Sequence, residues 1–211
     1  GKAFCLGGDI AWANTYGDGD LQAFFRDFTV PLARMISDMR QLPKPIIAAV
    51  NGICAGVGMS FAAACDIRIC HSQVVFKQAY TGVGISQDGG FSQMVPLIVG
   101  LGRASEMVFL DEVITAEKAL DWGFVNKVVA PEEFATEVEK MAAKLAGGAT
   151  KAFASSKALL NKALLPFAPI GVIAGVKVAR RIQPQLFYRL VYLGMFLTGC
   201  KLVWDAFAHG V

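Results

Sequence analysis

A short apolar run, a turn and a stretch of small residues follow one another directly in this chain, and this order constrains its fold most. Ile46–Val50 is enriched in Ile and Val, which is typical of a buried β-strand. The Asn51–Gly52 pair that comes next is a turn signal. Gly58–Cys65 is dense in small residues and predicts a buried helix. The succession indicates a domain in which strands and helices alternate.

The same alternation continues along most of the chain. Apolar residues three to four positions apart predict an amphipathic helix over Asp20–Gln41. Thr115–Asp121 is expected to be a short helix with Thr115 as its N-cap. Further strands are predicted at Gly1–Phe4, Ile67–Cys70, Val74–Phe76 and Val125–Val129, and further helices at Gly89–Val99, Ala104–Leu110, Glu132–Leu145 and Lys151–Lys162. The pattern predicts an α/β fold.

The composition excludes several classes of function. The 211 residues suffice for one domain with a useful core and an appendage. A net charge of +3 is too small to indicate nucleic-acid binding. Five scattered cysteines and two distant histidines show no metal-site spacing, so we predict no metal centre. Unpaired cysteines fit a reducing compartment, which favours the cytoplasm.

The character of the sequence changes after Lys162. Ala163–Val176 carries no charge, and Leu186–Phe207 is mostly apolar but contains three charged residues. A helix needs about 20 mostly apolar residues to cross a bilayer, and neither segment supplies that many without a charge. Buried helices, interfacial helices and short membrane spans all remain open. We therefore expect two parts, residues 1–162 and a hydrophobic helical tail over residues 163–211.

Two Gly-rich turns lie beside short apolar strands. They are the Phe4–Asp9 segment, which contains Gly7, and the Ala55–Ser60 segment, which contains Gly56 and Gly58. Glycine lets the backbone approach a ligand closely, and a helix N-terminus offers free N–H groups to an oxyanion or a phosphate. The alternative is that these turns only let a helix pack closely on a sheet.

Asp88 is the carboxylate of a third notable segment, Ile85–Gly90. Because a helix is predicted directly after it, the side chain is a candidate N-cap. The residue pattern alone favours this cap, although a carboxylate in a loop is also a candidate general base. The residue pattern leaves both roles open.

Six segments resemble the enoyl-CoA hydratase/isomerase (crotonase) family over about residues 1–162. In chain order they are FCLGGD, KPIIAAVNG, AGVGMSFAAACD, FKQAYTGVGISQDGG, VGLGRA and AEKALDWGFVNKVV. The resemblance implies the crotonase fold, a spiral of ββα units that usually assembles as a homotrimer. It also implies an acyl-CoA thioester as substrate and no separate cofactor, because coenzyme A is part of the substrate.

The resemblance further implies which groups act. Two backbone N–H groups of the family, which fall on Leu6 and Val57 here, hold the thioester oxygen as it becomes an enolate. Fixed donors at a developing charge stabilise it by several kcal/mol. The residues expected to contact the substrate beside them are Gly7, Gly56, Gly58, Ser60 and Tyr80.

Ser60 and Tyr80 argue against hydration. They stand where the hydratases of the family carry two glutamates that activate water, and neither is an acid near neutral pH. Several isomerases of the family resemble this chain around Asp88, with an aspartate serving as acid/base. The resemblance therefore favours isomerisation of a 3-enoyl to a 2-enoyl thioester with Asp88 as the catalytic residue.

The end of the chain resembles a different family. The segments LPFAPIG, ARRI, FYRLVY and LTGCKL are similar to the last part of the TauE/SafE sulfite-exporter permeases. This second resemblance implies one or two terminal membrane helices and a fusion of unrelated parts. The crotonase-like part also begins late, which indicates an N-terminal truncation. The alternative function is a membrane-anchored, non-catalytic remnant that contacts the membrane through residues 163–211.

Overall fold

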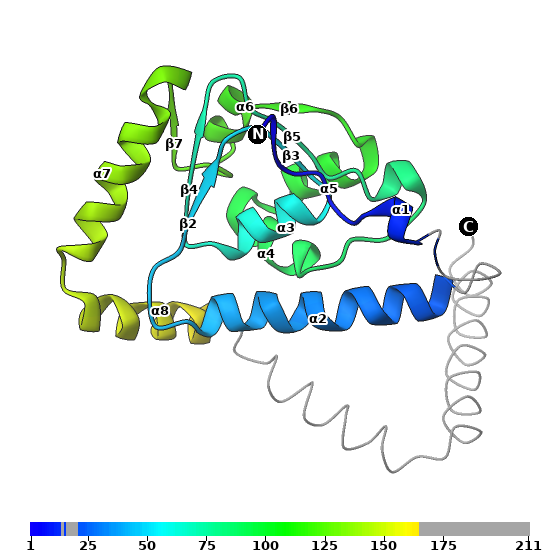
Figure 1. Ribbon diagram of the computed structural model, residues 1–211, viewed down its shortest axis with the longest axis horizontal. Helices are drawn as coiled ribbons and strands as arrows, with labels where there is room; N and C mark the ends of the chain where they lie inside the picture. The colour runs from blue at the N-terminus through cyan, green and yellow to red at the C-terminus, as the bar shows by residue number, and fades with distance from the viewer. Residues whose placement is uncertain (14, 16–20, 165–211) are drawn as a thin grey trace, which may run out of the picture. The chain divides into compact units, whose positions relative to one another are not determined.

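The computed structural model describes residues 1–13, 15 and 21–164 (Figure 1). Seven strands are described in this part: β1 (Ala3–Cys5), β2 (Ile47–Val50), β3 (Ile53–Ala55), β4 (Ile67–His71), β5 (Val75–Lys77), β6 (Ile114–Thr115) and β7 (Lys127–Val129). The helices are α1 (Ile10–Ala13), α2 (Leu21–Gln41), α3 (Val57–Ala64), α4 (Phe91–Val99), α5 (Leu101–Leu110), α6 (Ala116–Asp121), α7 (Phe134–Ala146) and α8 (Thr150–Leu164), with 3-10 turns η2 (Thr81–Val83) and η3 (Pro131–Glu133).

The strands form two sheets, and the chain steps from one to the other. One sheet has the order β1-β3-β5-β6 and the other β2-β4-β7. β2 passes directly to β3 and then to helix α3, and β4 passes to β5 and then to α4. Each unit thus gives one strand to each sheet before its helix. This confirms the predicted α/β architecture of ββα units within the described part.

Pairing within the sheets is mostly parallel. β2 lies beside β4 with Ile47 opposite Ile67, and β1 lies beside β3 with Cys5 opposite Cys54. Only the short β6 runs antiparallel to its neighbour β5. Because parallel strands share a direction, the turns after β1 and β3 emerge at the same end of their sheet, where the carboxyl ends of the strands lie.

The core surrounds helix α3. Seven of its eight residues are buried, including Met59, which explains why the sequence uses small side chains there. Phe76 of β5 and Phe124 are fully buried and meet edge to face with ring centroids 5.4 Å apart. Each such aromatic side chain contributes about 1.5–3 kcal/mol by leaving water.

A buried ionic cluster joins the C-terminal end of α2 to α8. Lys157 of α8 has a side chain only 6% exposed, and its Nζ lies 2.8 Å from the Asp66 carboxylate. The same ammonium donates to the backbone carbonyls of Met39 and Lys44, each at 3.0 Å. Arg40 adds a second cation to Asp66 at 3.1 Å. Lys157 is therefore a structural residue of this cluster.

We expect Lys157→Met to lower the free energy of unfolding by about 1–3 kcal/mol, because two backbone carbonyls lose their donor while Asp66 keeps Arg40. Urea unfolding of the variant measures the loss. Lys151→Met on the exposed face of the same helix is the control and should change stability little. Equal stability of both variants would show that the cluster contributes nothing.

Most predicted elements are confirmed by the described residues. The helix expected at Asp20–Gln41 is α2, and the Thr115 hydroxyl accepts from the Lys118 amide at 3.2 Å as the expected N-cap. Strand β3 was not predicted. The hydrophobic tail predicted over residues 163–211 lies, beyond residue 164, outside the described residues.

Candidate functional site

The two Gly-rich turns lie side by side at the carboxyl ends of strands β1 and β3. Gly7 has a φ of 109° and Gly56 a φ of 52°, which are backbone conformations that glycine adopts readily. A Cβ built on Gly56 would lie 3.4 Å from the Cα of Gly7, so the two backbones are nearly in contact. The structure thus brings together two segments that are about fifty residues apart in the sequence.

Gly58 serves close packing of α3 against β1. A Cβ at this position would lie 2.4 Å from the carbonyl oxygen of Cys5, a distance that no side chain tolerates. The packing alternative considered for the Gly-rich turns therefore holds at Gly58. This contact also fixes where the first turn of α3 lies relative to the end of β1.

We expect Gly58→Ala to destabilise the protein by about 1–3 kcal/mol, because the added methyl group must push α3 away from β1. Gly102→Ala is the matched control, since Gly102 lies in helix α5 and an added Cβ there meets nothing within 4 Å. Thermal unfolding of both variants checks the difference. A Gly58→Ala variant as stable as the control would contradict the close packing.

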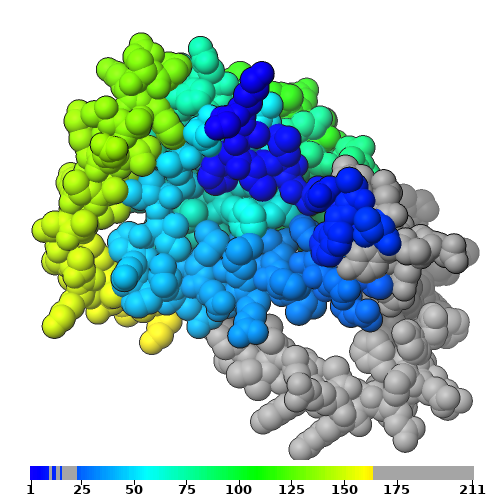
Figure 2. All heavy atoms as spheres, viewed as in Figure 1, coloured from blue at the N-terminus to red at the C-terminus, as the bar shows by residue number. Residues whose placement is uncertain are grey.

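The two expected oxyanion donors lie at the ends of these turns. Val57 is the first residue of α3, and an N–H in the first turn of a helix has no acceptor within the helix. The positive end of the helix dipole adds to the attraction for a negative charge at this point. Leu6 directly follows β1, and its side chain is exposed. Figure 2 shows the N-terminal segment in dark blue on the same face as α2.

Ser60, Tyr80 and Asp88 form a hydrogen-bonded group. The Tyr80 hydroxyl donates to Asp88 Oδ1 at 2.8 Å. The Ser60 hydroxyl donates to the backbone carbonyl of Asp88 at 3.0 Å, and its Oγ lies 2.9 Å from the Tyr80 hydroxyl oxygen. Ser60 and Tyr80 are both buried. Two residues expected to contact substrate therefore both contact Asp88, Tyr80 at the carboxylate and Ser60 at the backbone carbonyl.

Asp88 does not cap helix α4. The N-cap position belongs to Gly90, and no side chain makes a capping hydrogen bond there. The Asp88 carboxylate instead receives the Tyr80 hydroxyl, and in the part of the chain that the structure describes no other residue donates a hydrogen bond to it. The capping alternative left open by the sequence is therefore wrong.

Burial controls the protonation of this group. It raises the pKa of the Asp88 carboxyl, while the hydrogen bond from Tyr80 acts in the opposite direction. Burial also raises the pKa of the Tyr80 hydroxyl well above its usual range. Tyr80 therefore stays protonated as a donor, and Asp88 is the member of the group that can exchange a proton.

Helix α3 connects Asp88 to the expected oxyanion donor. Val57 and Ser60 are three positions apart and lie on the same helical face, separated by about 4.5 Å along the axis. Because the Ser60 hydroxyl donates to the backbone carbonyl of Asp88, the loop that carries the carboxylate is joined to the first half of α3.

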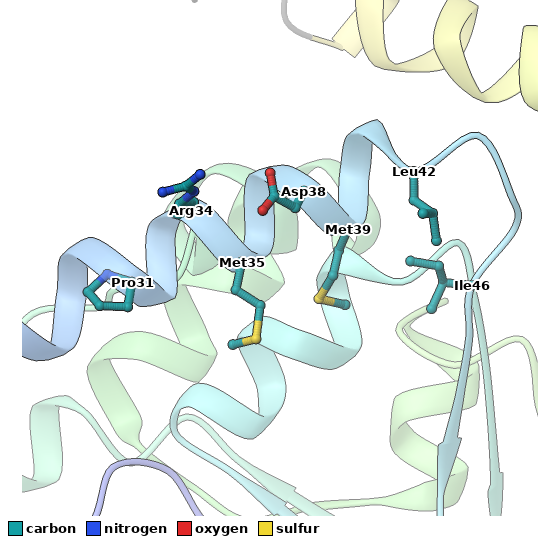
Figure 3. Close-up of a pocket in the computed structure, with 7 residues that line it drawn as sticks. All are labelled: Pro31, Arg34, Met35, Asp38, Met39, Leu42 and Ile46. Carbon is teal, nitrogen blue, oxygen red and sulfur yellow. The ribbon is translucent and has the colours of Figure 1, made fainter.

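A hollow of about 280 Å³ adjoins Asp88. Its other lining residues are Phe25 and Thr29 of α2 and the loop residues Ile85, Ser86 and Gln87. A second, open hollow of about 420 Å³ shares none of these residues. It lies on α2, where Met35 and Met39 point toward the helices beneath, while Arg34 and Asp38 point away (Figure 3).

Sequence reasoning missed the residues that hold Tyr80 in place. Ala79 has a φ of 58°, which is unusual for a residue other than glycine, and its amide donates to Asp111 Oδ1 at 2.9 Å. Gln78 also donates to Asp111, at 2.6 Å, and accepts from the Tyr80 amide at 3.2 Å. No sequence pattern signals this support, because Asp111 lies about thirty positions away.

Two further findings concern ligands and membranes. Within residues 1–13, 15 and 21–164, no three His, Cys, Asp or Glu side chains gather in a way that could hold a metal ion. None of the described helices is both long and apolar enough to span a bilayer.

Comparison with known proteins identifies the family. A family model described as enoyl-CoA hydratase/isomerase matches residues 1–181. The chain belongs to this family. The crotonyl-CoA hydratase of Syntrophomonas wolfei is 36% identical over 163 residues, which are 77% of this chain and 61% of that relative. The 1,2-epoxyphenylacetyl-CoA isomerase of Escherichia coli is 33% identical over 166 residues, which are 77% and 62%.

Solved structures support the crotonase-like fold. The structure of an enoyl-CoA hydratase from a Polaromonas species superimposes with a TM-score of 0.71 at 33% identity, covering 92% of this chain and 77% of that one. The chain spans about three fifths of the length of the curated relatives it matches. Hydratases and isomerases both occur among these relatives, so family membership does not select one reaction.

The family match reaches further along the chain than the resemblance noted in the sequence. It extends to residue 181, past the expected end of the crotonase-like part at residue 162. The resemblance of the tail to the TauE/SafE permeases is not supported by the comparisons, and neither are the fusion and the membrane attachment that it implied.

Proposed function

We propose that this member of the enoyl-CoA hydratase/isomerase family isomerises a 3-enoyl thioester of coenzyme A to the 2-enoyl thioester. The backbone N–H groups of Leu6 and Val57 hold the thioester oxygen, and Asp88 moves the proton. The observation that carries the proposal is the half-buried Asp88 carboxylate, which caps no helix, accepts the Tyr80 hydroxyl and belongs to a loop that is hydrogen-bonded to Ser60 of α3.

The reaction needs one base and one oxyanion site. Asp88 removes a proton from C2, and the electrons of that C–H bond form the C1–C2 double bond of a dienolate as the carbonyl electrons move to the thioester oxygen, which the two N–H groups stabilise. As the carbonyl re-forms, the C1–C2 electrons become the C2–C3 double bond, and the electrons of the former C3–C4 double bond take the proton from Asp88 at C4. Because the proton leaves and returns, no water, metal or redox group is consumed.

The residues around the carboxylate disfavour hydration. Activation of water requires a base that is ionised near neutral pH, and Ser60 and Tyr80 occupy the positions of the two family glutamates. Burial holds the Tyr80 hydroxyl in its protonated form. Gly7 and Gly56 let backbone approach the thioester, Gly58 holds α3 against β1, and the hollow beside Asp88, lined partly by Phe25, accommodates part of the acyl chain.

The remaining features follow from the family. We propose an acyl-CoA thioester as the only small-molecule partner, a cytoplasmic location and a homotrimer, as the resemblance implies. The large apolar side chains exposed on and beside α5 are consistent with self-association; they are Leu101, Phe109, Leu110 and Val113. Light scattering of the purified chain measures its assembly.

The proposal is tested by offering the purified protein a 3-enoyl-CoA and, separately, a 2-enoyl-CoA. Isomerisation produces the ultraviolet absorbance of the conjugated thioester from the first substrate. Hydration would remove that absorbance from the second. We expect turnover of the 3-enoyl substrate and at most slow hydration, and the reverse pattern would overturn the proposal.

A further inference from the structure

When the Asp88 carboxyl group is ionised, the hydroxyl groups of Ser60 and Tyr80 supply two protons for three oxygen–oxygen contacts. Three oxygen–oxygen contacts link Ser60, Tyr80 and Asp88. The backbone carbonyl and the carboxylate of Asp88 can only accept, so they take the Ser60 and Tyr80 hydroxyl protons. The remaining contact, Ser60 Oγ to the Tyr80 hydroxyl oxygen at 2.9 Å, then contains no proton.

Protonation of the Asp88 carboxyl group changes which oxygen accepts the Tyr80 hydroxyl proton. A neutral carboxyl group attracts the Tyr80 hydroxyl less strongly than a carboxylate does. The Tyr80 hydroxyl proton can then turn to Ser60 Oγ, which lies at nearly the same distance as Asp88 Oδ1. The ring itself stays fixed, because it is buried and packs edge to face on Phe91 with centroids 5.9 Å apart.

The two carboxylate oxygens of Asp88 are unequal. Oδ1 receives the Tyr80 hydroxyl, whereas Oδ2 receives no donor from another residue in the part of the chain described by the structure. Oδ2, which Tyr80 does not contact, is the oxygen that we assign to take a proton from a substrate carbon.

We propose that Tyr80 is the positioning residue for Asp88, donating to Oδ1 while the carboxylate is charged and turning to Ser60 while Oδ2 holds the substrate proton. The inference rests on the proposed isomerisation. Ser60 has two tasks in it: it anchors the backbone at Asp88, and it is the alternative acceptor for the Tyr80 hydroxyl.

The surroundings of the group favour this role. Tyr80 is the titratable side chain that contacts Asp88, and the residues of α2 that line the adjoining hollow, Phe25 and Thr29, are uncharged. Helix α3 contributes the uncharged side chain of Ser60 to this group. The Cys5 thiol has a small further effect on Tyr80. Changes at Tyr80 and Ser60 should therefore dominate the titration of Asp88.

The test titrates Asp88 directly in the full chain by carbon-13 NMR of aspartate carboxyl groups, with the Asp88 signal assigned by its loss in Asp88→Asn. Tyr80→Phe removes the donor to the charged form, so the midpoint should move to higher pH. Ser60→Ala removes the alternative acceptor of the protonated form, so the midpoint should move to lower pH. Ser92→Ala, exposed on α4, is the control.

The same variants are then assayed for isomerisation across pH. The acid limb of kcat/KM should follow the NMR midpoints, and kcat of Tyr80→Phe should fall about tenfold because the carboxylate loses a charge-assisted hydrogen bond. Midpoints that stay at the parent value in both variants, or that move in the same direction, would overturn the inference. Absence of isomerisation in the parent would instead contradict the proposed function, and the NMR titration separates the two failures.

Discussion

Asp88→Asn is expected to lower kcat for isomerisation of a 3-enoyl-CoA by about 100- to 10,000-fold, which is the usual contribution of a positioned acid/base. Asparagine keeps the shape of the side chain and still accepts from the Tyr80 hydroxyl, but it cannot take the proton from C2. Substrate binding should change little, because the oxyanion donors and the hollow beside Asp88 remain. Steady-state kinetics and calorimetric binding of a non-reactive acyl-CoA measure the two effects.

Asp121→Asn is the control for this change. Asp121 lies on α6 with a side chain 76% exposed, so losing its charge should leave kcat unaltered. If Asp88→Asn were as active as this control, a residue other than Asp88 would carry the proton. If it lost binding as well as turnover, Asp88 would be a structural residue of the loop.

Val57→Pro is expected to lower kcat by about 100- to 1,000-fold, because proline has no N–H and one of the two oxyanion donors disappears. Proline is well tolerated at the first position of a helix, and Val57 occupies that position in α3. The helix should therefore form, and circular dichroism checks that it does. The effect should fall on kcat more than on KM, since the charge develops during the reaction.

Val57→Ala is the matched control, because it shortens the side chain and keeps the N–H. We expect it to stay within a few-fold of the parent, since the proposed donor belongs to the backbone. A loss as large as that of the proline variant would mean that the side chain at this position matters, and the assignment of the N–H would fail.

The parts of the fold that local patterns encode were predictable. Helix α2 follows from the spacing of its apolar residues, and α6 follows from the Thr115 cap. Strand β3 was missed because it has three residues and follows its turn directly, so no local period identifies it. It exists because β1 and β5 pair with it on either side, which is information that only the tertiary structure contains.

The candidate site was predictable residue by residue but not as an arrangement. Family resemblance pointed to Leu6, Val57 and Asp88. The Tyr80–Asp88 hydrogen bond and the helix-capping role taken by Gly90 depend on how the loop after η2 folds back on α3. The Asp111 contact that holds Ala79 in its strained conformation is likewise absent from any local pattern.

Transfer of label within one substrate tests the central claim most directly. The purified chain is given a 3-enoyl-CoA that carries deuterium at C2, and the product is analysed by mass spectrometry and NMR. A single carboxylate that removes and returns the proton predicts a 2-enoyl-CoA with deuterium at C4, and it predicts that Asp88→Asn forms almost none of it. Recovery of unchanged 3-enoyl-CoA, together with hydration of a 2-enoyl-CoA by the same preparation, would contradict the account.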